Sequence, residues 1–166
     1  MRKVRYEVAV SLDGFIAGPN GEYDWISMDP EVDFAALYAQ FDTVFVGRRT
    51  FELFHTMMPK KETFVFSRTL QPTQYPDVTI VHEKPEDIVA QLRTEPGKDI
   101  WLYGGGLLFQ SLLETNLVDT VEVAVMPVLL GEGVPLFPSS YNPTKLELTY
   151  HRIYKSGIVK LAYNVK

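Results

Sequence analysis

The chain has 166 residues, of which 46% are hydrophobic and 22% charged, a composition typical of a single soluble globular domain with a sizeable core. Its net charge of −5 argues against a general nucleic-acid-binding surface, and no apolar run is long enough to span a membrane. The absence of cysteine excludes disulfides, thiolate nucleophiles and cysteine-ligated metals, and the three histidines lack metal-ligand spacing. We therefore expect one cytoplasmic domain over 1–166, without a metal, nucleic-acid or membrane partner.

Apolar stretches alternate with helical patterns along the chain. The predicted strands cover 4–10, 43–46, 63–66, 78–81, 100–103 and 121–126, and a hairpin of 146–154 and 158–165 follows. Residues 11–21 predict a long loop. The first predicted helix begins at Asp29, with Asp29 as its N-cap and Pro30 at its first helical position. Further helices are predicted to begin at 51, at 85 and after the glycines at 104–106. This order predicts a three-layer α/β fold, with a mostly parallel mixed sheet flanked by helices and a C-terminal antiparallel hairpin.

The glycine run Gly104–Gly105–Gly106 is the most informative segment, because it joins a buried strand to a helix. Such a turn directs bare backbone N–H groups toward the helix N-terminus, which suits a phosphate. Glycine permits a positive φ and a close approach of the ligand. The run is neither a Walker loop nor a G-x-G-x-x-G fingerprint. It suggests a nucleotide or dinucleotide ligand, and a purely structural turn is the alternative.

Three strand ends share groups that suit phosphate. In open parallel sheets, ligands bind outside the carboxyl ends of the strands, and arginine pairs bidentately with phosphate. We therefore expect a phosphorylated ligand, with solvated surface charge as the alternative role of the arginines. The residues concerned are Gly47, Arg48, Arg49, Thr50, Ser67, Arg68, Gly104, Gly105 and Gly106.

A second group of residues surrounds the loop after the first strand. The loop at 11–21 could close over a ligand, and Trp25 could pack against it. An acid among Asp29, Glu31 and Asp33 could face the same cleft and donate a proton if burial raises its pKa. Helix capping is the alternative for Asp29, and core packing is the alternative for Trp25.

Four segments occur in the order found in the dihydrofolate reductase-like superfamily: VAVSLDGFIA at 8–17, DW at 24–25, VFVGRRTFE at 44–52 and LYGGG at 102–106. Within this superfamily the chain resembles the reductase domain of bacterial riboflavin biosynthesis and its small stand-alone relatives, to which SLDGFIA and PVLLGEGVPLF at 127–137 are similar. The resemblance covers nearly the whole chain. It implies a mixed, mostly parallel sheet flanked by helices, an NADPH cofactor that reduces a flat nitrogen heterocycle, and a homodimer.

The resemblance also implies roles for individual residues. Ala9 and Ile16 would border the nicotinamide, and Ser67 and Arg68 would lie beside the adenosine phosphate. Folate reductases carry one acid on the first helix, and here Glu31 is the best positional match, ahead of Asp33. The pyrophosphate or 2′-phosphate would be held by Gly47, Arg48, Arg49 and Thr50, and the pyrophosphate would be cradled by Gly104, Gly105 and Gly106.

The sequence thus predicts an NADPH-dependent reductase of a small nitrogen heterocycle, with 5-amino-6-(5-phosphoribosylamino)uracil as one candidate substrate. Glu31 or Asp33 would supply the proton, because cysteine is absent and the histidines lie outside the motif regions. The alternatives are a nucleotide-binding module of the same fold without catalysis and a dihydrofolate reductase. A deaminase partner domain and its zinc signature are missing from the sequence.

Overall fold

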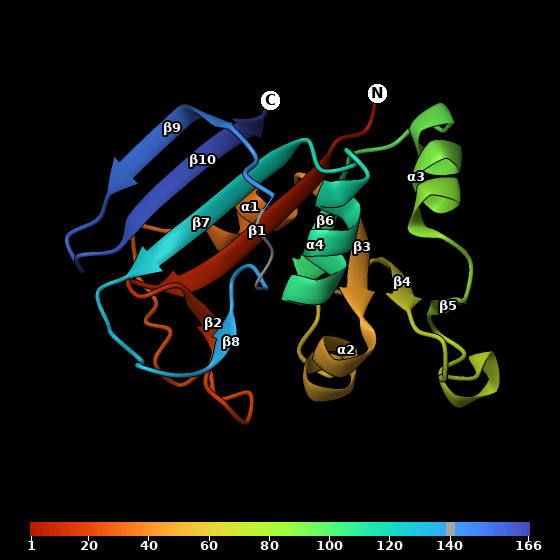
Figure 1. The fold of residues 1–166 in the computed structure, drawn as a ribbon, viewed down its shortest axis with the longest axis horizontal. Helices are drawn as coiled ribbons and strands as arrows, with labels where there is room; N and C mark the ends of the chain where they lie inside the picture. Colours follow the sequence, from red (N-terminus) through yellow and green to blue (C-terminus); the bar gives the residue numbers. More distant parts are fainter. Residues whose placement is uncertain (139–141) are drawn as a thin grey trace.

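The computed structural model describes residues 1–138 and 142–166, and its centre is an eight-stranded sheet in the order β5-β4-β3-β6-β1-β7-β10-β9 (Figure 1). Neighbouring strands from β5 to β7 pair in parallel, whereas β10 runs antiparallel to both β7 and β9. This arrangement confirms the predicted mixed sheet with its C-terminal hairpin. The strands are β1 (Val4–Ser11), β3 (Phe41–Gly47), β4 (Glu62–Phe66), β5 (Thr79–Val81), β6 (Asp99–Gly104), β7 (Thr120–Met126), β9 (Leu146–Ile153) and β10 (Val159–Val165).

Helices cover both faces of the sheet. In Figure 1, α3 (Pro85–Thr94) and α4 (Gly106–Glu114) lie in front of the sheet, and α1 (Phe34–Tyr38) lies behind it. The remaining helices, α2 (Arg48–Phe54) and a 3-10 turn at Pro72–Gln74, follow β3 and β4. No helix in the described ranges has the length and apolar character needed to cross a membrane.

The main hydrophobic core lies on the α4 face of the sheet. Because side chains alternate along a strand, Val4, Tyr6 and Val10 of β1 point to this face. Tyr6 is fully buried and its ring stacks on that of Phe109 in α4, with the ring centroids 3.9 Å apart. The same alternation sends Arg5, Glu7 and Ala9 to the α1 face, which carries the candidate site.

Two local predictions were wrong. The first helix begins at Phe34 with Asp33 as its N-cap, not at Asp29. Asp29 instead accepts hydrogen bonds from the N–H of Glu31 at 2.8 Å and of Ser156 at 3.2 Å, so it ties the loop before α1 to the turn between β9 and β10.

The predicted loop at 11–21 contains a short strand, β2 (Phe15–Ala17), which pairs with β8 (Val134–Pro135). Strand β2 has three residues and β8 has two, which is too few for a periodic pattern. The two strands also lie more than a hundred residues apart in the sequence.

Candidate active site

The carboxyl ends of β3 and β6 lie next to each other at the lower edge of the sheet in Figure 1. A Cβ atom added to Gly47 would lie 3.6 Å from the backbone nitrogen of Gly105, and one added to Gly105 would lie 3.0 Å from Oγ1 of Thr50. The structure therefore brings Gly47, Thr50 and the glycine run together, as the strand-end argument predicted. The positive φ of the run is at Gly104, at +134°.

Helix α4 directs unpaired backbone donors toward this edge. Its first internal hydrogen bond runs from the N–H of Phe109 to the carbonyl of Gly105, so the N–H groups of the first turn have no partner within the helix. Gly106 has a different role from Gly105. A Cβ on Gly106 would lie 2.9 Å from the carbonyl oxygen of Pro135, so close packing of β8 accounts for glycine at this position.

The three predicted phosphate-binding arginines lie on the surface of this edge. Arg48, Arg49 and Arg68 are exposed, and Arg48 makes only a long ion pair of 3.8 Å with Glu52 on the same helix. Ser67 is buried, and its Oγ accepts hydrogen bonds from the N–H groups of the two residues after Arg68, at 3.1 and 3.0 Å. Ser67 therefore shapes the turn that carries Arg68, and its contact with a phosphate stays a prediction.

A cleft of about 720 Å³ opens on the α1 face of the sheet. Ala9 of β1 lines it, together with side chains of β7, β10, α1 and the loop before α1. Ile16 packs against the main core instead and is not among the described residues that line the cleft. Trp25 packs near Met126 and Ile158, which is the core role given as its alternative.

Of the three candidate acids, Asp29 is buried in the cleft lining, but hydrogen bonds from Ser156 and from the N–H of Glu31 lower its pKa; the expected burial is wrong for the other two. Glu31 and Asp33 both line the cleft, but both are exposed. Glu31 pairs with Arg152 at 3.1 Å and Lys155 at 3.3 Å, and the carboxylate of Asp33 caps α1 through the N–H of Ala36. They lie at the rim because the chain from 29 to 33 is an irregular loop over the cleft. Their part in proton transfer stays a prediction.

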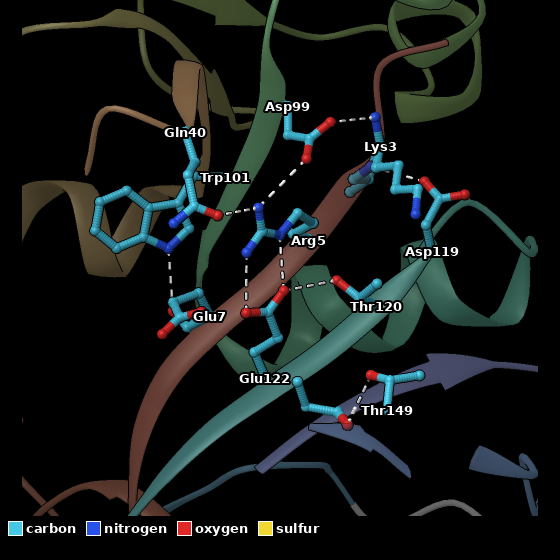
Figure 2. Close-up of polar contacts among 12 residues, drawn as sticks. Lys3, Arg5, Glu7, Gln40, Asp99, Trp101, Asp119, Thr120, Glu122 and Thr149 are labelled. Carbon is cyan, nitrogen blue, oxygen red and sulfur yellow. Dashed lines mark hydrogen bonds and ion pairs between the residues drawn. The ribbon is translucent and has the colours of Figure 1, made fainter. Parts of the chain in front are cut away.

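The floor of the cleft contains a buried polar cluster that the sequence analysis missed, formed by Arg5, Glu7, Glu122 and Lys160. Figure 2 shows Arg5 bound to both carboxylate oxygens of Glu122, with Nε–Oε1 at 2.7 Å and Nη2–Oε2 at 3.0 Å. Lys160 donates to Oε1 of Glu7 at 2.8 Å. The only sequence signal was a charged residue at alternate positions of an otherwise apolar strand.

The two glutamates differ in their ionisation. Burial raises the pKa of Glu7 to about 7, and a hydrogen bond shared with Glu122 acts in the same direction, while the charge of Lys160 opposes both. Burial also acts to raise the pKa of Glu122, but the hydrogen bonds and charge of Arg5, with Glu7 and Lys160, outweigh it and lower the pKa. With a pKa of about 7, Glu7 keeps a proton in a large fraction of molecules near neutral pH, whereas Glu122 is ionised.

Among the residues that the structure describes, no group of three histidine, cysteine or acidic side chains is placed to hold a metal ion.

Comparison with known proteins places this geometry in a family. The model of the RibD C-terminal domain matches residues 2–160. The uncharacterized protein YyaP of Bacillus subtilis (strain 168) is 37% identical over an alignment 179 positions long, which covers 98% of this chain and 95% of YyaP. A putative riboflavin biosynthesis protein from Shewanella sp. PV-4 is 30% identical with a TM-score of 0.86, covering 100% of this chain and 99% of that one.

A dihydrofolate reductase from Enterococcus faecalis, in complex with NADP(H), has a TM-score of 0.72 at 17% identity and covers 99% of this chain and 96% of its own. The dihydrofolate reductase-like fold expected from the sequence is thus confirmed. The chain belongs to the RibD C-terminal domain family.

Proposed function

We propose that the chain is a cytoplasmic NADPH-dependent reductase that transfers a hydride to a small nitrogen heterocycle, with the aminopyrimidine of riboflavin biosynthesis as one candidate substrate. The RibD C-terminal domain family is a family of reductase-like proteins, and the Enterococcus faecalis protein of the same fold carries NADP(H). The observation that supports the cofactor most strongly is the cradle at the carboxyl ends of β3 and β6. This cradle consists of Gly47, Thr50, Gly104, Gly105 and the free N–H groups of the first turn of α4.

The residues of this cradle fit a dinucleotide. The glycines at 47 and 105 leave the backbone uncovered, since a Cβ on Gly105 would enter the space beside Thr50. The N–H groups of the first turn of α4 are suited to a pyrophosphate, and the exposed Arg48, Arg49 and Arg68 would hold the 2′-phosphate. When bound, NADPH would supply the hydride.

The cleft on the α1 face fits the substrate half of the reaction. Ala9, expected to border the nicotinamide, lies in the same strand and on the same face as Glu7 at the floor. Two residues of a strand span about 6.6 Å, so a flat ring bound over Ala9 would lie within reach of the Glu7 side chain. The apolar walls, which include Ile26 and Val32, and the few charged groups are typical of a small-molecule site.

The first test compares the affinities for NADPH and NADH, measured by the tryptophan fluorescence of the protein. NADPH should bind at least tenfold more tightly, because each arginine contact with the 2′-phosphate contributes about 1.5–3 kcal/mol. Arg68→Ala should weaken this preference. Lys166→Ala is the matched control for loss of a cation, because Lys166 is exposed at the edge of the sheet opposite the carboxyl ends of β3 and β6. Equal affinities of the unmodified protein for the two cofactors would contradict the role of the arginines.

The second test follows NADPH oxidation in the presence of pterins, dihydrofolate and aminopyrimidines. Oxidation that depends on one of these compounds supports a reductase and identifies its substrate class. Tight NADPH binding without oxidation by any of them favours the nucleotide-binding module. Turnover of dihydrofolate alone favours the folate reductase.

A further inference from the structure

Glu7 and Glu122 are direct neighbours in the parallel register of β1 and β7, and both side chains are buried, at 8% and 6% exposure. Like charges placed opposite each other in a sheet destabilise it, and a buried charge needs a partner. Arg5 and Lys160 supply two cations, one paired with Glu122 and one with Glu7.

The hydrogen bonds of the two carboxyl groups are unequal. Both oxygens of Glu122 are occupied by Arg5, and Oε1 also accepts from the hydroxyl of Thr120 at 3.1 Å. Glu7 receives Lys160 on Oε1, whereas no donor of the described residues binds its buried Oε2. An ionised oxygen in that position would be left without a donor, which is costly. A proton on Oε2 removes this cost, because a carboxyl can donate to the neighbouring carboxylate of Glu122.

The cluster holds Glu7 in a fixed place within the cleft. The indole N–H of Trp101 donates to the backbone carbonyl of Glu7 at 3.0 Å, and β1 is held between β6 and β7 (Figure 2). The charged groups that face Glu7 are Arg5 from β1, Glu122 from β7 and Lys160 from β10. Asp29, Glu31, Asp33 and Arg152 also line the cleft, from the loop before α1 and from β9.

We propose that Glu7, and neither Glu31 nor Asp33, donates the proton that accompanies hydride transfer; this inference rests on the proposed function. The carbon of a C=N or C=O group of the substrate accepts the hydride that NADPH supplies, and the π-electron pair moves to the nitrogen or oxygen. That atom takes the proton from the Glu7 carboxyl, which becomes a carboxylate paired with Lys160. The cofactor is left as NADP⁺, and solvent reprotonates Glu7 through the cleft.

The inference is tested first on the protein without cofactor. In a carbon-13 NMR titration of labelled glutamate, one carboxyl should titrate near pH 7 and be missing from Glu7→Gln. Glu122→Gln should lower this midpoint, because it removes the neighbouring carboxylate. Lys160→Met should raise it, because it removes the cation that favours ionised Glu7. A Glu7 carboxyl with an ordinary midpoint would overturn the inference whatever the substrate.

The second test measures turnover of the substrate found by NADPH oxidation. Glu7→Gln should lower kcat by about 100-fold or more, the scale of general-acid catalysis, with NADPH affinity retained. In the unmodified protein kcat should fall above neutral pH, because Glu7 loses its proton there. This fall should disappear in Glu7→Gln and should move to higher pH in Lys160→Met. Glu114→Gln, at the exposed end of α4, is a control for loss of a carboxylate.

The outcomes separate the two proposals. Normal turnover by a folded Glu7→Gln variant, or a loss confined to Glu31→Gln or Asp33→Asn, overturns the role of Glu7 and leaves the reductase proposal standing. Failure of the unmodified protein to bind NADPH overturns the proposed function itself. Circular dichroism establishes that each variant is folded before it is assayed.

Discussion

Replacing Glu7 by glutamine should change how the stability of the protein depends on pH. The pKa of Glu7 is raised in the folded state from 4.5 to about 7, so the folded state binds the proton more tightly than the unfolded chain does. The stability that this group contributes is therefore fully present below pH 4.5 and is lost as the pH rises through about 7. Glutamine carries no such proton, so this part of the pH dependence should vanish in the variant.

The size of the effect follows from the displacement of the pKa. Raising the pKa of one carboxyl from 4.5 to about 7 corresponds to about 3 kcal/mol of unfolding free energy. The side chain is only 8% exposed, so solvent screening reduces this value little. The difference in unfolding free energy between Glu7→Gln and the unmodified protein should therefore move by about 3 kcal/mol in favour of the variant between about pH 4 and pH 8.

Urea unfolding at several pH values measures this difference directly. Subtracting the two proteins removes the contributions of all other titrating groups that the substitution leaves unchanged. Glu114→Gln, whose side chain is exposed, is the matched control for loss of a carboxylate. A Glu7→Gln difference that does not vary with pH would refute the reasoning, because it would mean that Glu7 titrates alike in the folded and unfolded chains.

Three further predictions concern the rest of the molecule. Gly106→Ala should destabilise the protein by about 1–3 kcal/mol in urea unfolding, because its Cβ would press on the Pro135 carbonyl, whereas Gly105→Ala should mainly weaken NADPH binding. Hydrogen bonds from the hydroxyl of Ser11 and from the N–H groups of residues 130 and 131 lower the pKa of Asp13 to about 2. These amides should exchange faster in Asp13→Ala, and in the unmodified protein the contact should persist above pH 3.8 and be lost as the pH falls through about 2. Finally, every residue of β9 is exposed in the described chain, including apolar ones, so light scattering at micromolar concentration should give a homodimer mass, and a monomer mass would contradict this prediction.

The strands of the sheet could be predicted from the sequence because each is a near-continuous apolar run. Segments such as Val44–Phe45–Val46 and Ile100–Trp101–Leu102 are buried on both faces, and this leaves a signal that needs no knowledge of the partner strands. The cradle at the ends of β3 and β6 was predictable for the same reason. Glycine and arginine after a buried strand imply where the backbone turns, and parallel strands end at one edge of the sheet.

The start of the first helix could not be predicted, because the competing partner is distant. Asp29 followed by proline is a good local signal for a helix start. In the structure, however, the Asp29 carboxylate is bound by the N–H of Ser156, 127 positions further along the chain. Hydrogen bonds from Ser156 and the N–H of Glu31 also hold the pKa of Asp29 below its usual range. A long-range contact thus replaces the local capping role, which Asp33 takes four residues later.

The polar cluster was missed for a related reason. The cluster residues come from three strands, and only the pairing register shows that the two glutamates, Glu7 and Glu122, meet. Seen alone, Glu7 is one charge in the first strand of a sheet, and an exposed position is its ordinary explanation. The family resemblance places the acid near the first helix instead, and Glu31 and Asp33 of that region are exposed at the rim of the cleft.

A cluster of four ionisable side chains in the sheet is itself an argument for a site. Replacing paired buried charges with apolar side chains of similar volume is often neutral or stabilising, so stability alone gives little reason for two glutamates at the centre of this sheet. The cluster also lies in β1, the strand that carries Ala9 on the same face. A strand fixes the spacing of Glu7 and Ala9, because a register shift of one residue would move the Glu7 side chain to the other face of the sheet, into the main core. If Ala9 borders the nicotinamide, the proton on Glu7 is therefore held at a constant distance from the source of the hydride, which is the arrangement that reduction of a C=N or C=O bond requires.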